Sequence, residues 1–362
     1  MSRKTNERRS RRRTHCSRRA VTNQRKRTGS KSRKSIYESV TNNGPYSYAF
    51  VSNNTFLKVS RVPNKKTKFI LVAVPYDGSV TNRPGARYGP SAIREASMML
   101  CDAIHPTFNI SPINYTVDIG DINVPITSID AMRKVLEKSA ISLINKTHNE
   151  KQLIWLGGDH SITLSLLRAY NYVFKQPIGL IHFDAHSDAW ADLFGEKSDH
   201  GTWVYEATQE KLIDPKYCVQ IGLRSSGAKK TRTFIQNKGG LVFTAQELRG
   251  LENREQLASI IKQIISRFRS RKRPVYISFD IDCLDPAFAP GTGTPEPAGL
   301  STNQVMTLFE ELVYKLNLIG MDCVEVSPLY DHTQLTSQAA AYIVWTYMCA
   351  TLSRLKKRKV FS

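Results

Sequence analysis

The sequence predicts a three-layer α/β domain, in which helices cover both faces of a mainly parallel sheet of eight strands. From about residue 66, short β-branched or apolar runs alternate with longer amphipathic stretches, the pattern of parallel strands joined by crossover helices. Several of the short runs, such as LIWLG, IGLIHFD and VYISFD, are continuously apolar. A strand of this kind is buried on both faces, so helices are expected above and below the sheet.

The individual elements can be placed in chain order. The expected strands are Lys68–Pro75, Tyr115–Ile119, Gln152–Leu156, Ile178–Phe183, Cys218–Leu223, Gly240–Phe243, Pro274–Phe279 and Leu318–Val326. The expected helices include Pro90–Ala103, Asp130–Ile144, Glu255–Phe268, Thr302–Lys315 and Thr336–Lys357. Pro90 suits the first position of its helix, where the amide hydrogen that Pro lacks would be unsatisfied anyway. Without an internal repeat or a second linker, residues 66–362 are expected to form one domain.

The N-terminus is set apart by its charge. Residues 1–40 are expected to form a basic, disordered tail, and residues 41–65 an extension that packs on the domain. Residues 1–35 hold fifteen Lys or Arg and one acidic residue, so they carry +14 of the formal charge of +21. With no aromatic and few apolar residues, this segment cannot offset the entropy cost of folding. A solvated tail is the first interpretation, non-specific contact with polyanions the second, and organelle targeting the third, because there is no apolar helical face.

Composition limits the class and the compartment. A chain of 362 residues, of which 41% are hydrophobic, is long enough to bury a core and is not a disordered chain. No run approaches the roughly 18 apolar residues of a membrane-spanning helix, and no cleavable signal is recognisable. We therefore expect a soluble, cytoplasmic protein. The cysteines lie far apart, as expected for unpaired thiols in a reducing compartment; they are Cys16, Cys101, Cys218, Cys283, Cys323 and Cys349.

Three predicted strands end in segments rich in acidic residues and histidine. The segments are LGGDHS at residues 156–161, HFDAHSD at residues 182–188 and SFDIDCLDP at residues 278–286. In sheets of this kind, ligands bind outside the carboxyl ends of the strands. Alternate residues of an extended segment share a face, so Asp184, His186 and Asp188 can converge, as can Asp280 and Asp282.

The composition of these segments indicates a metal site. Four carboxylates buried together would be prohibitive without a compensating positive charge, and with His160 and His186 they suit two divalent cations that share ligands. Oxygen-rich sites with one imidazole per ion favour Mn²⁺ over Zn²⁺, although Ni²⁺ or Co²⁺ could substitute. Taken alone, His160 could be an ordinary hydrogen-bonded residue. The DxHxD pattern on an apolar strand is harder to explain by packing, whereas His182 has no assigned role.

The motifs resemble those of the ureohydrolase family of arginases and agmatinases, most closely the agmatinase branch. The matching segments are GGDHS, DAHSD, DHGT at Asp199–Thr202, SFDIDCLDPAFAPGTGTPEPAGLS at Ser278–Ser301, RPGARYGPSAIR at Arg83–Arg94, DIGD at Asp118–Asp121 and VEVSP at Val324–Pro328. The resemblance runs from about Val74 to the C-terminus and leaves out the basic tail. It implies an arginase-like fold and a homo-trimer or homo-hexamer.

The same resemblance implies the roles of individual residues. One Mn²⁺ would be held by His160, Asp184, Asp188 and Asp280, and the other by Asp184, His186, Asp280 and Asp282. A hydroxide that bridges the ions would attack the guanidinium carbon, releasing urea and an amine. Asp188 would pass the proton to the leaving nitrogen, and His200 would shuttle protons at a pKa near neutrality. Glu325 would face the guanidinium, whose planar donors match a carboxylate.

One departure from the family pattern bears on the substrate. Arginases place a polar Asn two positions beyond the last Asp of DxHxD, and here that position is Trp190. The aromatic side chain disfavours arginine and favours agmatine, whose distal ammonium needs an acid. The candidates for that acid are Asp192, Glu196, Asp199 and Glu296. Guanidinobutyrate or guanidinopropionate would instead need Lys197 or Arg224, and free guanidine would need a pocket shortened by Trp190 and Trp203.

Two other classes of function remain open from the sequence. The basic tail also suits a polyanion-binding protein built on an inactive ureohydrolase scaffold, although the complete set of six ligand residues argues against lost activity. A deacetylase of related fold would bind one metal ion and would not need both His160 and Asp282. The number of metal ions per chain separates the three classes: two for guanidine hydrolysis, one for the deacetylase and none for the binding protein.

Overall fold

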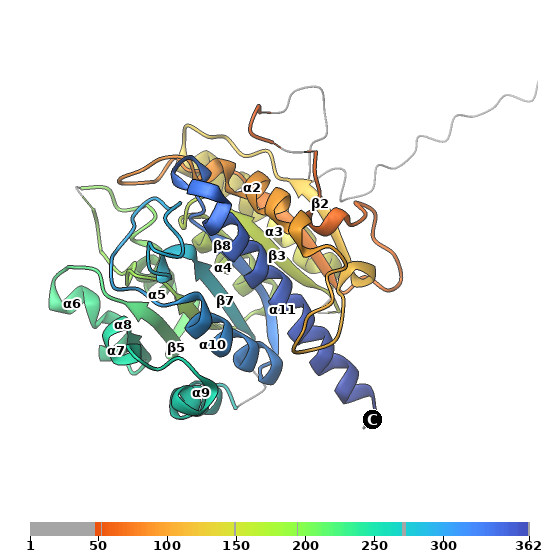
Figure 1. Cartoon of the computed structure of the whole chain (residues 1–362). Helices are drawn as coiled ribbons and strands as arrows, with labels where there is room; N and C mark the ends of the chain where they lie inside the picture. Colours follow the sequence, from red (N-terminus) through yellow and green to blue (C-terminus); the bar gives the residue numbers. More distant parts are fainter. Residues whose placement is uncertain (1–47, 52, 148–149, 194, 270–272, 361–362) are drawn as a thin grey trace, which may run out of the picture. The chain divides into compact units, whose positions relative to one another are not determined.

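The computed structural model describes residues 48–360 apart from residue 52, residues 148–149, residue 194 and residues 270–272 (Figure 1). The expected basic tail and the first part of the expected N-terminal extension lie outside the described residues, and they stay predictions. All five cysteines within the described residues are free thiols. Among the helices of the described part of the chain, none combines the length and the apolar character needed to cross a membrane.

Eight strands form one sheet in which neighbouring strands are parallel. They are β1 (Phe69–Val74), β2 (Thr116–Asp121), β3 (Gln152–Gly157), β4 (Ile178–Phe183), β5 (Ile213–Leu223), β6 (Leu241–Thr244), β7 (Val275–Asp280) and β8 (Leu318–Val324). Their order across the sheet is β2-β1-β3-β8-β7-β4-β5-β6. All eight predicted strands are present, and the largest difference is that β5 begins at Ile213 rather than Cys218.

The helices connect these strands. They are α2 (Gly89–Ala96), α3 (Ile129–Thr147), α4 (Ile162–Phe174), α5 (Trp203–Gln209), α6 (Lys229–Arg232), α7 (Phe234–Asn237), α8 (Ala245–Leu248), α9 (Arg254–Arg267), α10 (Thr302–Lys315) and α11 (Leu335–Val360). The predicted helix from Pro90 ends at Ala96 instead of Ala103, because the chain continues as a 3₁₀ turn and Cys101 adopts a φ of 23°. The helix α4, in which residues 162–167 are all buried, was not among the helix ranges predicted from the sequence.

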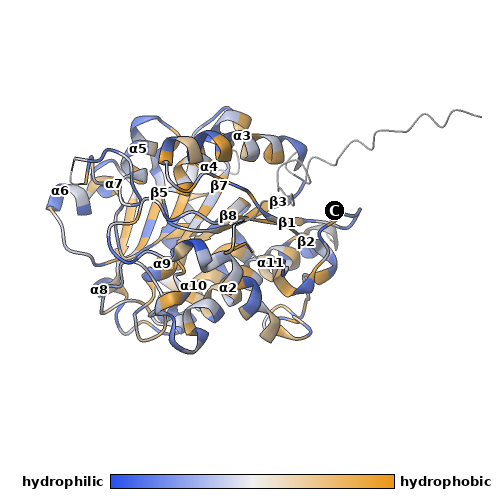
Figure 2. Cartoon of the chain, turned by 90° about the horizontal axis from the view of Figure 1, so that it is seen from above, coloured by the Kyte–Doolittle hydropathy of each residue, from blue (hydrophilic) through white to orange (hydrophobic). Residues whose placement is uncertain are grey.

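The helices form a layer on each face of the sheet, which confirms the predicted architecture. Figure 2 shows α3, α4 and α5 on one side of the sheet and α2, α9, α10 and α11 on the other. Successive residues of β1 point alternately into the two cores: Phe69, Leu71 and Ala73 into one, and Ile70, Val72 and Val74 into the other. Because both faces are buried, polar side chains within the strands need buried partners, and a site open to ligands is expected at the ends of the strands.

A buried ion-pair network joins the segment before β1 to the sheet. Arg94 of α2 is fully buried and donates to both carboxylate oxygens of Asp118, at 2.8 and 2.9 Å, and to Asp121. The backbone amide of Phe56, also fully buried, donates to Asp118 at 2.8 Å. Two of the long sequence motifs, RPGARYGPSAIR and DIGD, therefore meet in a structural contact between α2 and β2.

Candidate metal centre

The carboxyl ends of three central strands bring together all six predicted metal ligands. His160 lies between β3 and α4. Asp184, His186 and Asp188 follow β4. Asp280 is the last residue of β7, and Asp282 lies in the 3₁₀ turn Ile281–Cys283 that follows it. Five of the six are buried and His186 is half-buried. Parallel strands end at the same edge of the sheet, so segments far apart in the sequence meet there.

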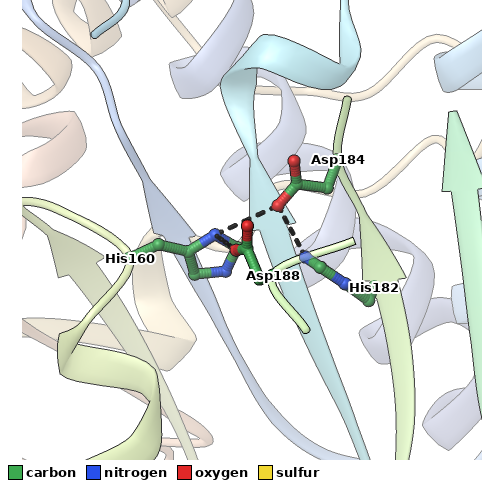
Figure 3. Close-up of side chains that lie close together, drawn as sticks. All are labelled: His160, His182, Asp184 and Asp188. Atoms are coloured by element: carbon green, nitrogen blue, oxygen red, sulfur yellow. Dashed lines mark hydrogen bonds and ion pairs between the residues drawn. The ribbon is translucent and has the colours of Figure 1, made fainter. Parts of the chain in front are cut away.

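The first group of ligand atoms surrounds the imidazole of His160. Its Nδ1 atom lies 3.2 Å from Oδ2 of Asp184, 3.2 Å from Oδ2 of Asp188 and 3.0 Å from Oδ2 of Asp280. Figure 3 shows His160 directed at the carboxylates of Asp184 and Asp188. Nitrogen and three carboxylate oxygens thus face one small volume, a donor set that suits a hard or borderline divalent cation.

The second group lies beside the first and shares Asp184 with it. Nδ1 of His186 lies 3.3 Å from Oδ1 of Asp184 and 3.1 Å from Oδ2 of Asp282. Asp184 therefore turns one oxygen toward each histidine. Among the described residues, this second group consists of Asp184, His186 and Asp282 and does not include Asp280, whose Oδ1 instead accepts the backbone amide of Asp282 at 2.8 Å.

The electrostatics of the two groups fit cations. Burial, Asp282 and Asp184 together raise the pKa of Asp280 well above its ordinary value. Burial lowers the pKa of His160, but its carboxylate partners outweigh burial and raise that pKa well above its ordinary value. Both shifts mean that the cluster attracts positive charge, and two divalent cations would supply that charge in place of protons. The geometry and the donor set therefore fit a binuclear metal site.

Unusual backbone conformations aim the side chains at the site. A Cβ atom on Gly158 would lie 1.7 Å from the carbonyl oxygen of Tyr76, so only glycine allows β3 to turn into α4 here. Asp188 and Glu325 adopt φ values of 48° and 64°, in the left-handed region that side chains other than glycine rarely occupy. Such strain gathers where a site requires a particular side-chain direction.

Two neighbours of the ligands carry contacts that the sequence analysis did not assign. Trp203 donates from Nε1 to Oδ2 of Asp188 at 2.7 Å and is fully buried, so it braces a ligand rather than shortening the pocket as expected for free guanidine. The Nε2 atom of His182 lies 2.7 Å from Oδ2 of Asp184 (Figure 3). His182 stands two residues before Asp184 on β4, so alternation along a strand could have placed both on one face.

His200 and Glu325 lie together beside the first group. Nδ1 of His200 is 3.0 Å from Oε1 of Glu325, which also accepts the amide of His160 at 2.8 Å. Burial lowers the pKa of His200, but Glu325 outweighs burial and raises it to about 9, above the neutral value expected from the sequence. The other oxygen of Glu325, Oε2, is buried, and no described residue forms a hydrogen bond with it. A free carboxylate oxygen is thus available to a donor in the site.

A cavity of about 240 Å³ leads to these residues. His160, His186, Asp188, Asp280, His200 and Glu325 form part of its wall. Trp190 and Leu193 also line it, together with Ser225 and Ser226. Trp190 is therefore part of the wall of this cavity. The cavity is small and carries polar groups at its base, which suits a small, linear ligand.

The charged residues that were candidates for the distal group of a substrate are placed differently. Glu296 lies nearest the site, with Oε1 at 3.7 Å from Nε2 of His186 and accepting Ser225 Oγ at 2.9 Å. The Oδ1 atom of Asp199 accepts a hydrogen bond of 2.7 Å from the backbone amide of Gly201, two residues further along the chain. Arg224 is occupied by backbone carbonyls, including those of Glu296 and Asp282. The remaining candidates, Asp192, Glu196 and Lys197, are exposed.

Comparisons with known proteins agree with this geometry. The model of the Arginase family matches residues 67–350. An agmatinase from Neisseria meningitidis serogroup C is 40% identical over 278 residues, covering 76% of this chain and 84% of that protein. An agmatinase from Salmonella enteritidis is 39% identical over 278 residues, covering 75% of this chain and 84% of that protein.

Solved structures show the same fold. Proclavaminate amidino hydrolase from Streptomyces clavuligerus aligns with a TM-score of 0.73 at 34% identity, covering 85% of this chain and all of that one. A hypothetical agmatinase from Burkholderia thailandensis aligns with a TM-score of 0.71 at 36% identity, covering 81% of this chain and 87% of that one. The sheet order, the paired His and Asp groups and these matches lead to one conclusion: the chain belongs to the arginase family.

Proposed function

We propose that this protein hydrolyses agmatine to putrescine and urea, with one water consumed per turnover. The observation that carries the proposal is the pair of His and Asp groups beside Glu325, whose buried Oε2 forms no hydrogen bond within the described part of the chain. A guanidinium ion has N–H donors in one plane, and these could form the hydrogen bond that Oε2 of this carboxylate is able to accept. The agmatinases that are 39% to 40% identical to this chain support agmatine as the substrate.

We propose that two Mn²⁺ ions occupy the site, with Ni²⁺ or Co²⁺ as possible substitutes. The side chains that would hold them are His160, Asp184, His186, Asp188, Asp280 and Asp282. When bound, the ions act as Lewis acids that activate water for attack near neutral pH. The predominance of oxygen ligands, with one imidazole in each group, supports Mn²⁺ over Zn²⁺.

Three further roles follow from the chain's own contacts. Glu325 orients the guanidinium through Oε2, while its Oε1 stays bonded to His160 and His200. Asp188 passes a proton to the nitrogen that leaves with the amine, and Trp203 holds Asp188 in place for this step. His200 exchanges protons with solvent from the cavity wall, where Thr81 Oγ1 lies 2.8 Å from its Nε2.

The pocket favours a substrate without an amino-acid head group. Trp190 occupies the wall where hydrogen bonds to such a head group would be needed. Arg224 is already satisfied by backbone carbonyls, which disfavours guanidinobutyrate and guanidinopropionate. Of the two tryptophans that free guanidine would need to shorten the pocket, Trp203 is buried against Asp188 and Trp190 lines the cavity, so only one of them limits its length.

A substrate panel tests the proposal. Urea release would be measured from agmatine, arginine, guanidinobutyrate, guanidinopropionate and guanidine, each with Mn²⁺ and with Ni²⁺. We expect agmatine with Mn²⁺ to give the highest kcat/KM. Fastest release from arginine would contradict the role of Trp190, and fastest release from guanidinobutyrate would show that Lys197 or another cation receives a carboxylate.

Metal content distinguishes this function from the other classes. Two ions per active chain support hydrolysis of guanidines, one supports a deacetylase, and none supports a polyanion-binding protein on an inactive scaffold. We further propose a homo-trimer or homo-hexamer in the cytoplasm, with a tail that contacts polyanions non-specifically. Light scattering of the purified chain would measure the oligomer, and the location of a tagged full-length chain would test the compartment.

A further inference from the structure

We propose that Asp322 is a positioning residue of the metal centre, which acts through Ser278 to hold His160 with its Nδ1 atom free to bind metal. This inference rests on the proposed function and goes beyond it, because Asp322 touches neither the cavity nor any of the six ligand residues. Asp322 lies in β8 and is fully buried. A fully buried carboxylate calls for an explanation.

A continuous hydrogen-bonded chain leads from Asp322 to His160. Ser278 of β7 is the register partner of Asp322 in the sheet, and its Oγ donates to Oδ1 of Asp322 at 2.7 Å. Nε2 of His160 lies 2.8 Å from the same Oγ. Both Ser278 and Asp322 have no exposed surface, and His160 has 1%, so no water competes for these contacts.

The directions of these hydrogen bonds follow from which groups can donate a proton and which can only accept one. A carboxylate can only accept, and Asp322 is surrounded by donors: Ser278 and the amide of Phe279 at Oδ1, and Thr163 and Tyr276 at Oδ2. The one hydroxyl proton of Ser278 is thus used toward Asp322. Its oxygen can then only accept from His160, which places the imidazole proton on Nε2.

That proton position prepares the opposite nitrogen for metal. A neutral imidazole with its proton on Nε2 has a bare lone pair on Nδ1. Nδ1 is the atom that lies 3.0 to 3.2 Å from three carboxylate oxygens of the first group. The chain from Asp322 therefore selects the tautomer that can join those oxygens as a ligand, and it also fixes the orientation of the ring.

The carboxylate is the part of this chain that a neutral group cannot replace. An amide or hydroxyl at position 322 could donate as well as accept, so it would not dictate the direction of the Ser278 hydroxyl. Replacement of buried charged groups by apolar side chains often leaves the stability of the folded protein unchanged or increases it, so stability alone does not explain Asp322. An acceptor-only group instead serves to order the hydrogen bonds between β8, β7 and His160.

Mn²⁺ titration of the metal-free chain tests the inference. Ser278→Ala breaks the chain, Asp322→Asn removes the charge at nearly constant shape, and Ser278→Thr keeps the hydroxyl. We expect the first two variants to weaken binding of one Mn²⁺ ion by roughly 10- to 100-fold, with the second ion nearly unchanged. Ser278→Thr should restore most of the affinity. At one Mn²⁺ ion per chain, Ser278→Ala should fill only the unaffected site. Its electron paramagnetic resonance spectrum should then lack the signal of a coupled Mn²⁺ pair.

Thr163→Val is the matched control. It removes the hydrogen bond of 2.9 Å to Oδ2 of Asp322 and leaves the path to His160 intact, so both Mn²⁺ affinities should stay at the wild-type value. The inference would be overturned if the folded Ser278→Ala variant bound both Mn²⁺ ions as tightly as the wild type. It would also be overturned if Thr163→Val and Ser278→Ala lost the same Mn²⁺ affinity. The readout does not depend on turnover. A chain that binds two ions but releases no urea from agmatine would contradict the proposed function and not the role of Asp322.

Discussion

The indole of Trp203 and the carboxylate of Asp188 form a hydrogen bond of 2.7 Å at the base of the metal centre. Asp188 adopts a left-handed backbone conformation with a φ of 48°, and the same Oδ2 atom faces Nδ1 of His160 at 3.2 Å. Trp203 also packs its ring against His160, with centroids 4.8 Å apart. One buried aromatic side chain thus holds a metal ligand and packs against another.

Trp203→Phe should weaken the site while preserving the fold. The substitution removes a hydrogen bond to a charged acceptor, worth roughly 1.5–3 kcal/mol, so we expect Mn²⁺ affinity and kcat to fall about 10- to 100-fold. Trp155→Phe is the control, because Trp155 is equally buried but donates to none of the site carboxylates. Equal losses of Mn²⁺ affinity in the two variants would mean that packing, and not the hydrogen bond, is responsible.

Removal of metal should destabilise the protein. Without cations, Asp184, Asp188, Asp280 and Asp282 repel one another in a buried space, and the site loses the binding free energy of the ions. At a metal concentration 100 times Kd this amounts to about 2.7 kcal/mol per ion, so chelation should lower Tm by roughly 5 to 10 °C. Calorimetry with chelator, then with Mn²⁺ restored, measures this. An unchanged Tm would contradict a metal site of this affinity.

Glu325→Gln should separate substrate binding from metal binding. The Gln side chain has an NH₂ group in place of the second carboxylate oxygen, and this group cannot accept a hydrogen bond from a guanidinium. We therefore expect kcat/KM for agmatine to fall by roughly 100-fold or more while two Mn²⁺ ions remain bound. The pKa of His200, which Glu325 raises to about 9, should fall toward its ordinary value. Metal analysis and the pH profile of kcat would measure both effects. Loss of metal in this variant would place Glu325 among the residues that organise the ligands.

Glu296→Gln should discriminate between charged and uncharged substrates. If Glu296 receives the distal ammonium of agmatine, kcat/KM for agmatine should fall roughly three- to fivefold, since this carboxylate is partly exposed. Butylguanidine, which lacks that ammonium, should be turned over as before. An equal decrease with both substrates would indicate that Glu296 acts on the neighbouring imidazole of His186, 3.7 Å away, and not on the substrate.

His105 should make the fold sensitive to acid. Burial lowers the pKa of His105 to about 4, and its Nε2 lies 3.2 Å from Oγ1 of Thr346. Because the folded pKa lies below that of the unfolded chain, the unfolded chain binds the proton first, and stability is lost as the pH falls from about 6.5 toward 4.

A non-titrating variant isolates this effect. The free energy of unfolding of His105→Gln, relative to wild type, should rise by on the order of 1–2 kcal/mol between pH 7.5 and pH 5. Denaturant unfolding of both proteins with the same Mn²⁺ concentration cancels the pH dependence of metal binding. A difference between the two proteins that does not change with pH would show that His105 is not the acid-sensitive group.

The layers and the strands of this protein can be predicted from its amino-acid pattern. Residues 153–157 are apolar on both faces of a strand, and residues 275–280 are buried on both faces, which requires helices above and below. The acidic and histidine residues at the ends of those strands then had one place to meet, the carboxyl edge of the sheet. The end of α2 and the range of α4 were less accessible, because α2 passes directly into a 3₁₀ turn at Ser97 and six consecutive residues of α4, 162–167, are buried around the whole helix.

The arrangement of protons and hydrogen bonds around the ligands, in contrast, depends on contacts that exist only in the folded chain. Asp322, Ser278 and His160 lie on β8, β7 and the turn after β3, and nothing in their spacing along the chain predicts contact. The same holds for Trp203 with Asp188. Local sequence encodes which face of an element is buried, whereas these contacts depend on the order and register of neighbouring strands, which arise when the whole sheet assembles.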